Sequence, residues 1–425
     1  MKKVLWIIAV GLVISLTVST TTSCSKELFD KETADTMKLL SFHNDKVDAN
    51  QSWLLIRDWT LQVKANVPGV KRIEILSENP YQSPYAEILA THNVTENQQI
   101  GISYSMPTLC EKVYVAAVTD DGTYTIVETT ADNSSVVDFS SGRIDTNGTM
   151  YELRQQQVFY CFDTAFPEPS STWGYNDLVL SVAKEYVNEY VMRLKVTLRA
   201  IGTTKQVAAA IRLDGVPYEN VSHVAIEGNN TFVHNKDAKR VLIENQELLI
   251  KAKDGSAVIN LFDDAHAAFY TQQNDNGTVS RYKFNVSHEV GPEYMGYPEL
   301  TVTYYINFNE PGFSDRIGFL NFDPFVVYYY ITTPWEIHKF RYKFQETIWD
   351  YFDDNQSAYK DRFTWCVEVP YSQFRYPTAG NSLGSYKSGA IYGTYQKRGH
   401  SFGEWVSNEE KARDWYLYPT GSMVY

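Results

Sequence analysis

The stretch that decides the fold reads MRLKVTLRA and occupies residues 192–200. From Met192 to Ala200 every second residue is apolar, and the residues between them are arginine, lysine or threonine. Such a period of two places one face of a strand in a core and the other toward water, which indicates a half-buried antiparallel strand. Residues 300–308, which read LTVTYYINF, alternate in the same way.

The same alternation extends outward from these two stretches. Residues 100–106 and 113–117 alternate, and Asp121-Gly122 then turns the chain toward residues 124–126, as in a hairpin. The aromatic run 325–330 is expected to be a strand buried on both faces, with an exposed aromatic contact surface as the alternative. Helical patterning is scarce throughout the chain.

The best helix signal is the S-x-x-E match that begins at Ser407, which predicts a short helix from there toward Trp415. The patterns together predict an all-β protein with two parts. Residues 43–138 hold enough short strands for one immunoglobulin-like β-sandwich, and residues 143–425 form a larger β-rich module. A serine-rich stretch between them has the composition of a linker.

Composition and charge exclude two classes of protein. The chain has 425 residues with 31 Tyr, 21 Phe and 9 Trp, which is too aromatic for an intrinsically disordered protein. Its formal net charge is −13, so its surface would repel a polyanion, and no nucleic-acid partner is expected.

The N-terminus has the composition of a secretory signal over residues 1–23. Two lysines precede an apolar run, residues 4–18, that is too short to span a bilayer. Small polar residues follow the run and end in TTSC at residues 21–24, and this stretch resembles the serine- and threonine-rich lipobox of Bacteroidetes lipoproteins. The resemblance implies that Cys24 becomes the mature N-terminus and carries the lipid. Secretion with an unmodified cysteine is the alternative.

Residues 24–42 form a polar tether, and their acid-containing beginning resembles the surface-export signal of Bacteroidetes lipoproteins. A plain solvated tether is the alternative. Removing the signal removes two lysines, so the mature charge is −13 − 2 = −15. Because an anionic membrane surface repels such a protein, the lipid on Cys24 is expected to provide the membrane attachment. The expected location is the outer membrane, on the cell surface.

Residues 155–425 resemble the LruC domain, a largely uncharacterised domain of bacterial envelope lipoproteins. The resemblance rests on CFD followed by YNDLV, on NFDPF followed by WEIH, and on WCVEVP followed by FRYP. These blocks occupy residues 161–163, 175–179, 321–325, 335–338, 365–370 and 374–377. The resemblance implies an envelope lipoprotein with a preceding β-sandwich, and it implies no established reaction.

The first candidate site comprises Asp163, Asn176 and Asp177. Carboxylate and amide oxygens at the start of a strand suit Ca²⁺, which takes several oxygen ligands in irregular geometry. The resemblance implies further acids just before Tyr175, but residues 171–174 read STWG. The alternative is a turn in which Asn176 and Asp177 bond to nearby backbone without a metal.

The second candidate site comprises Asp323, Trp335, Glu336 and His338. An aromatic ring, two carboxylates and an imidazole could contact a sugar or a peptide ligand. The alternative is a structural role in which these side chains fix a long loop to a sheet face.

The sequence therefore favours a non-enzymatic lipoprotein that binds glycan or protein, or mediates adhesion, at the cell surface. One alternative is a periplasm-facing structural protein of the envelope without an external ligand. Another is a glycan-active hydrolase, which requires two acids facing each other in a deep cleft. No residue is assigned a catalytic role.

Overall fold

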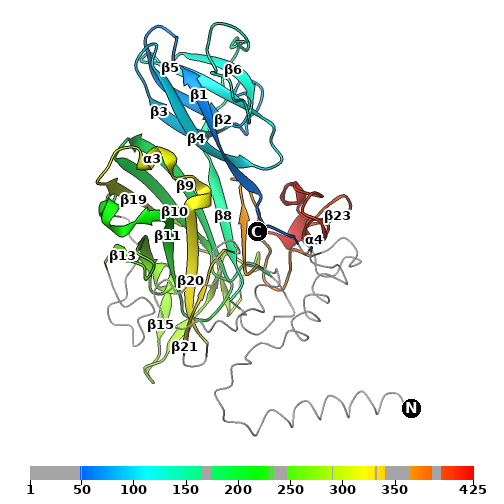
Figure 1. Cartoon of the computed structure of the whole chain (residues 1–425). Helices are drawn as coiled ribbons and strands as arrows, with labels where there is room; N and C mark the ends of the chain where they lie inside the picture. Colours follow the sequence, from blue (N-terminus) through cyan, green and yellow to red (C-terminus); the bar gives the residue numbers. More distant parts are fainter. Residues whose placement is uncertain are drawn as a thin grey trace.

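The computed structural model describes residues 48, 50–164, 174–229, 232, 247–289, 291–330, 333–339, 364–384 and 394–425. Within them the chain forms two successive β-sandwiches with few helical turns, which confirms the expected all-β class (Figure 1). No helix in these ranges is long and apolar enough to cross a membrane.

The first module packs a two-stranded sheet on a five-stranded sheet. The small sheet pairs β1 (Ile56–Lys64) with β4 (Gln99–Pro107). The larger one has the order β6-β5-β2-β3-β7, formed by Tyr124–Thr130, Lys112–Thr119, Val70–Leu76, Glu87–Asn93 and Arg154–Gln155. Their facing side chains, such as Leu61, Ile102 and Val115, form one buried core. Asp121 and Gly122 make the turn between β5 and β6, as expected.

The stretch after residue 138 is part of this first module. Phe139 lies fully buried in the core between its sheets, and Ile144 and Leu153 pack on the outer face of the larger sheet. Strand β7 then pairs in parallel with β3. The serine-rich residues expected to form a linker are therefore flanked on both sides by residues packed on the sandwich.

The second module is a larger antiparallel sandwich. One sheet has the order β12-β19-β10-β9-β8-β22, formed by Val221–Ile226, Leu300–Phe308, Val191–Ala200, Leu178–Asn188, Gln157–Phe162 and Cys366–Val369. The other has the order β13-β14-β11-β20-β21, formed by Leu249–Lys251, Ser256–Phe262, Val207–Pro217, Phe322–Tyr330 and Thr333–Ile337. The two alternating stretches quoted first are the adjacent strands β10 and β19, with Val196 opposite Val302. The apolar residues of both sheets meet in a common core.

Strand β20 is buried on both faces, as the aromatic run predicts. Val326 and Tyr328 face the main core, whereas Phe325 and Val327 belong to a separate apolar cluster on the opposite face of the sheet. All four side chains are fully buried.

The helix predicted to begin at Ser407 is wrong, because α4 (Phe402–Ser407) ends there. The capping box that starts this helix is the earlier S-x-x-E match: the Ser401 hydroxyl accepts from the Glu404 backbone N–H at 3.1 Å. The Glu404 carboxylate in turn accepts from the Ser401 backbone N–H at 3.2 Å. Trp405 and Val406 follow that match and are buried, so packing favours the earlier start.

The first described residues of the chain pack on the second module. The Gln51 side-chain amide donates to the Trp405 carbonyl oxygen at 2.6 Å, and the Trp53 ring meets the Trp405 ring edge-on at 5.6 Å. The chain then passes into β1, so a contact with the C-terminal helix precedes the first sandwich (Figure 1).

Candidate functional site

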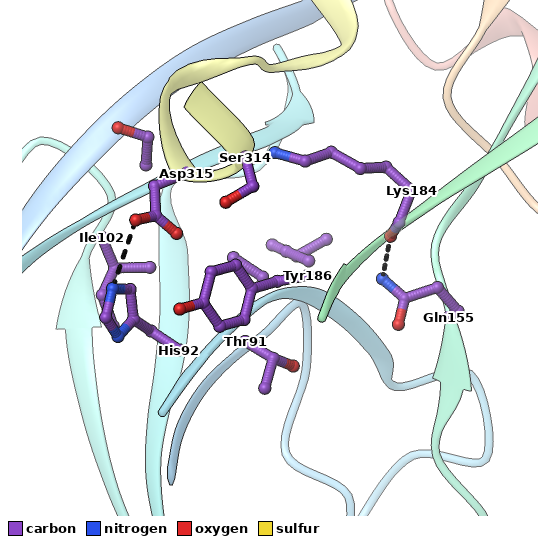
Figure 2. A pocket seen from close by; sticks show the side chains of 11 residues that line it. Thr91, His92, Ile102, Gln155, Lys184, Tyr186, Ser314 and Asp315 are labelled. Carbon is purple, nitrogen blue, oxygen red and sulfur yellow. Dashed lines mark hydrogen bonds and ion pairs between the residues drawn. The ribbon is translucent and has the colours of Figure 1, made fainter. Parts of the chain in front are cut away.

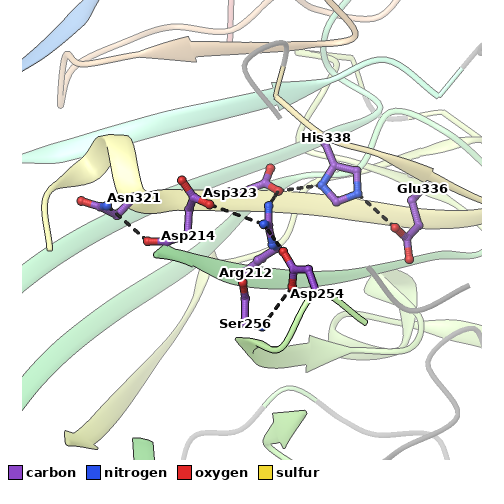
Figure 3. A network of polar contacts seen from close by, with 8 residues as sticks. All are labelled: Arg212, Asp214, Asp254, Ser256, Asn321, Asp323, Glu336 and His338. Atoms are coloured by element: carbon purple, nitrogen blue, oxygen red, sulfur yellow. Dashed lines mark hydrogen bonds and ion pairs between the residues drawn. The ribbon is translucent and has the colours of Figure 1, made fainter. Parts of the chain in front are cut away.

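Strand register brings four charged side chains together on one face of the five-stranded sheet of the second module (Figure 3). They are Arg212, Asp323, Glu336 and His338. Arg212 on β11 lies directly opposite Asp323 on β20. Glu336 on β21 lies opposite Val327, and His338 follows two residues later on the same face. Trp335 points to the other face, where it joins the main core. The four residues predicted to form a ligand site therefore divide between two faces of the sheet.

His338 is held between two carboxylates. Its Nδ1 lies 2.7 Å from Asp323 Oδ2, and its Nε2 lies 3.0 Å from Glu336 Oε2. The ring also stacks on Phe325, with centroids 4.7 Å apart. Burial disfavours the charged imidazolium, but Asp323 and then Glu336 outweigh this and raise the pKa of His338 to about 9. His338 is therefore a cation at neutral pH.

Arg212 extends this network to β11, the central strand of the sheet. One guanidinium nitrogen lies 3.7 Å from Asp323 Oδ2, and another pairs with Asp254 and lies 3.4 Å from Asp214 Oδ1. Asp323 and Glu336 are fully buried. Because carboxylates without solvent access cannot reach a ligand, the network fixes β20 and β21 to β11, which favours the structural alternative.

The Asp177 carboxylate and the Asn176 amide of the predicted calcium site brace a turn. The Asn176 side-chain amide donates to the Pro377 carbonyl oxygen at 2.8 Å. Asp177 Oδ2 accepts from the backbone N–H and the hydroxyl of Thr164 at 2.8 and 2.7 Å. Gly202 packs so closely that a Cβ there would lie 2.5 Å from the Asn176 carbonyl oxygen.

Asp163 is buried beside this turn, and its backbone N–H donates to the Trp365 carbonyl oxygen at 3.0 Å. Among the described residues, no group of three or more His, Cys, Asp or Glu side chains is arranged to hold a metal ion. The contacts of Asn176 and Asp177 fit the turn alternative, and the calcium site stays a prediction. Cys24 lies outside the described ranges.

A small cavity lies between the two modules (Figure 2). The His92 ring of the first module stacks on the Tyr186 ring of the second module, with the ring centroids 5.0 Å apart. His92 Nε2 lies 3.3 Å from Asp315 Oδ2. His92 Nδ1 faces the Asn93 carbonyl oxygen at 2.7 Å. The hydrogen bond to Asp315 raises the pKa of His92. The cavity measures about 20 Å³, enough for a single water molecule, so it is an intermodule contact and too small for a ligand.

Lys184 of the second module lines the same cavity. Its ammonium donates to the Ile317 carbonyl oxygen, and burial lowers its pKa to about 8, partly offset by Asp315 and Asp58. The Gln155 side-chain amide donates to the carbonyl oxygens of Lys184 and Ile88, at 2.8 and 3.1 Å. These bonds connect the second module to β3 of the first.

An open groove of about 430 Å³ lies on the first module. It is lined by the loop between β2 and β3 and by the residues around the start of β5, namely Ser77, Glu78, Asn79, Gln82, Ser83, Leu109, Cys110, Glu111, Lys112 and Tyr114. We call it the β2–β5 groove. No motif in the sequence marks it, because its two loops lie about thirty residues apart and neither carries a recognisable signature.

The Cys110 thiol in this groove is free and partly buried. Burial, followed by the charges of Glu78 and Glu87, raises its pKa to about 11. A thiol with such a pKa is protonated at neutral pH and is a poor nucleophile. The groove therefore offers polar and apolar contacts without an activated thiol.

Comparison with known proteins places the second module in a family. A family model described as "Domain of unknown function (DUF4842)" matches residues 188–416, more than half of the chain. The chain belongs to the DUF4842 family. The DUF4842 region includes Arg212, Asp323 and His338, whereas the β2–β5 groove precedes it.

The DUF4842 chain is also similar to a crystal structure of a candidate lipoprotein from Bacteroides ovatus. The similarity covers 84% of this chain and 99% of the other, with 15% identity and a TM-score of 0.49. No curated protein matches the DUF4842 chain.

Proposed function

We propose that this DUF4842 protein is a lipoprotein of the outer membrane, anchored through Cys24 and exposed on the cell surface, that binds glycan or protein without catalysing a reaction. The anchor is supported by the two N-terminal lysines, the apolar run of residues 4–18 and the TTSC stretch that ends at Cys24. The acid excess supports it further, since charge alone would keep the mature protein away from an anionic membrane.

One observation carries the binding role: the β2–β5 groove is open to solvent, while the charged network of Arg212, Asp323 and His338 lies inside the second module. Asp323 and Glu336, two of the carboxylates that sequence motifs single out, are fully buried and bonded to His338. A glycosidase instead needs two carboxyl groups on either side of a substrate in a cleft. The arrangement favours binding over hydrolysis.

We further propose that the second module is an LruC-type domain. The motif blocks that carry this resemblance span residues 161–377 and overlap most of the family match over residues 188–416. The same resemblance supports placement in the bacterial envelope.

Protease treatment of intact cells tests the location. Cells that express the full chain should lose it on external protease treatment, and a Cys24→Ala variant should leave the membrane fraction. Protection of the chain in intact cells, together with its digestion after lysis, would favour the periplasm-facing structural protein instead. A periplasmic protein that is cleaved only in lysed cells is the control for membrane integrity.

A further inference from the structure

We infer that the β2–β5 groove is a binding site for a neutral saccharide. This inference rests on the proposed binding function and specifies the ligand class and the residues that contact it. The volume of the β2–β5 groove, about 430 Å³, falls within the range of about 300–1,000 Å³ typical of small-ligand sites. It lies on the first sandwich, outside the region that the family model matches.

The groove displays both donors and acceptors to solvent. Gln82 is exposed and presents an amide that can donate and accept, while Glu78 and Glu111 are exposed acceptors. Sugar hydroxyls donate and accept in the same way, so a saccharide can satisfy these groups simultaneously.

Charge in the groove disfavours an anionic ligand. The lining contains the carboxylates of Glu78 and Glu111, and its single cation, Lys112, is engaged by Glu128 at 2.5 Å. Sulfated, phosphorylated or uronic ligands would meet uncompensated negative charge. The acceptable ligands are therefore neutral or cationic.

Apolar surface in the groove favours the neutral saccharide over a simple cation. Leu109 is 38% exposed, and the partly buried Tyr114 adds a ring to the same lining. A sugar ring has one face of C–H groups that packs on such surface while its hydroxyls reach the polar rim. An ammonium group would gain nothing from Leu109.

The loop that forms one wall is held in place before any ligand arrives. Asn79 Oδ1 accepts from the Tyr81 backbone N–H at 2.9 Å, and Ser77 Oγ accepts from the Glu87 backbone N–H at 2.9 Å. These bonds fix both ends of the wall. A preformed wall lowers the entropy lost on binding.

Retention of the chain from residue 25 onward on immobilised polysaccharides tests the inference. The probes are laminarin, mannan and xylan as neutral polymers, with polygalacturonate as the anionic polymer and poly-L-lysine as a soluble cationic competitor. The Gln82→Ala, Glu111→Ala double variant is compared with Gln273→Ala, Glu310→Ala, whose residues are equally exposed but lie on the second module. Because all four side chains are exposed, both variants should keep the wild-type Tm.

The expected result is retention on at least one neutral polymer that the groove variant weakens at least tenfold and the control variant leaves unchanged. Equal retention of wild type and groove variant would overturn the inference. So would retention on polygalacturonate alone, or displacement by poly-L-lysine, which would indicate a cationic ligand. If the wild type binds no polysaccharide, the saccharide inference fails, while protease accessibility and protein binding still decide the proposed function separately.

Discussion

Replacement of His338 by glutamine should remove a pH-dependent part of the stability of the second module. The imidazolium lies between Asp323 Oδ2 at 2.7 Å and Glu336 Oε2 at 3.0 Å, and both carboxylates are fully buried. Without the cation the two carboxylates would remain buried and lose their main partner. Removing one partner of a buried ion pair costs about 3–5 kcal/mol.

The pH dependence follows from the pKa of His338, which is about 9 in the folded protein and about 6.5 in the unfolded chain. Since each tenfold difference in proton affinity corresponds to about 1.4 kcal/mol, the folded state gains about 3 kcal/mol from protonated His338. Because the folded pKa is the higher one, this gain is complete below pH 6.5. It is lost as pH rises through 9.

The assay is urea unfolding of wild type and His338→Gln at several pH values from 6 to 9.5. The difference between their free energies of unfolding should be largest at pH 6 and smaller by about 3 kcal/mol at pH 9.5. Glu87 and Lys184 also titrate in this range. Because the wild type and His338→Gln both contain them, their effects cancel in the difference between the two free energies of unfolding. The exposed His223→Gln is the matched control. A difference that stays constant with pH would refute the assignment of a charged His338.

Three further predictions concern the contacts around the modules. Burial raises the pKa of Glu87 to about 7, so its ionisation destabilises the fold as pH rises from 4.5 to 7, and Glu87→Gln should flatten the Tm profile there; an unchanged slope would contradict this. Because Asp315 raises the pKa of His92, Asp315→Asn should lower the free energy of unfolding more at pH 6 than at pH 8.5, by about 1 kcal/mol or less. An equal loss at both pH values would argue against the pair. Asn176→Ala should cost about 1–3 kcal/mol while EDTA leaves the wild-type Tm unchanged; a Tm that falls with EDTA would indicate bound Ca²⁺.

Local patterns in the sequence predicted the strands well, because one buried face imposes a period of two. Residues 192–200 and 300–308 are β10 and β19, and the Asp121-Gly122 hairpin has the expected turn. The helix start was the failure, since two S-x-x-E matches lie six residues apart. Only the earlier one, at Ser401, is followed directly by buried side chains, whereas residues 408–414 after the later one are exposed or half-buried.

The charged network was predictable only in part, since its partners meet through strand pairing over a long sequence distance. Alternation along β21 alone would have separated Trp335 from Glu336 and His338 onto opposite faces. Arg212 carried no signal, because its place opposite Asp323 depends on the register between β11 and β20. The groove shares this limit: Gln82 and Glu111 come together through the sheet of the first module.

The central claim, binding without catalysis, is tested most directly by incubating the chain with the polysaccharide that retains it and measuring new reducing ends over time. We expect saturable retention and a polymer of unchanged length. Shortened chains that accumulate with wild type and disappear with Glu111→Gln would contradict the claim and identify a hydrolase.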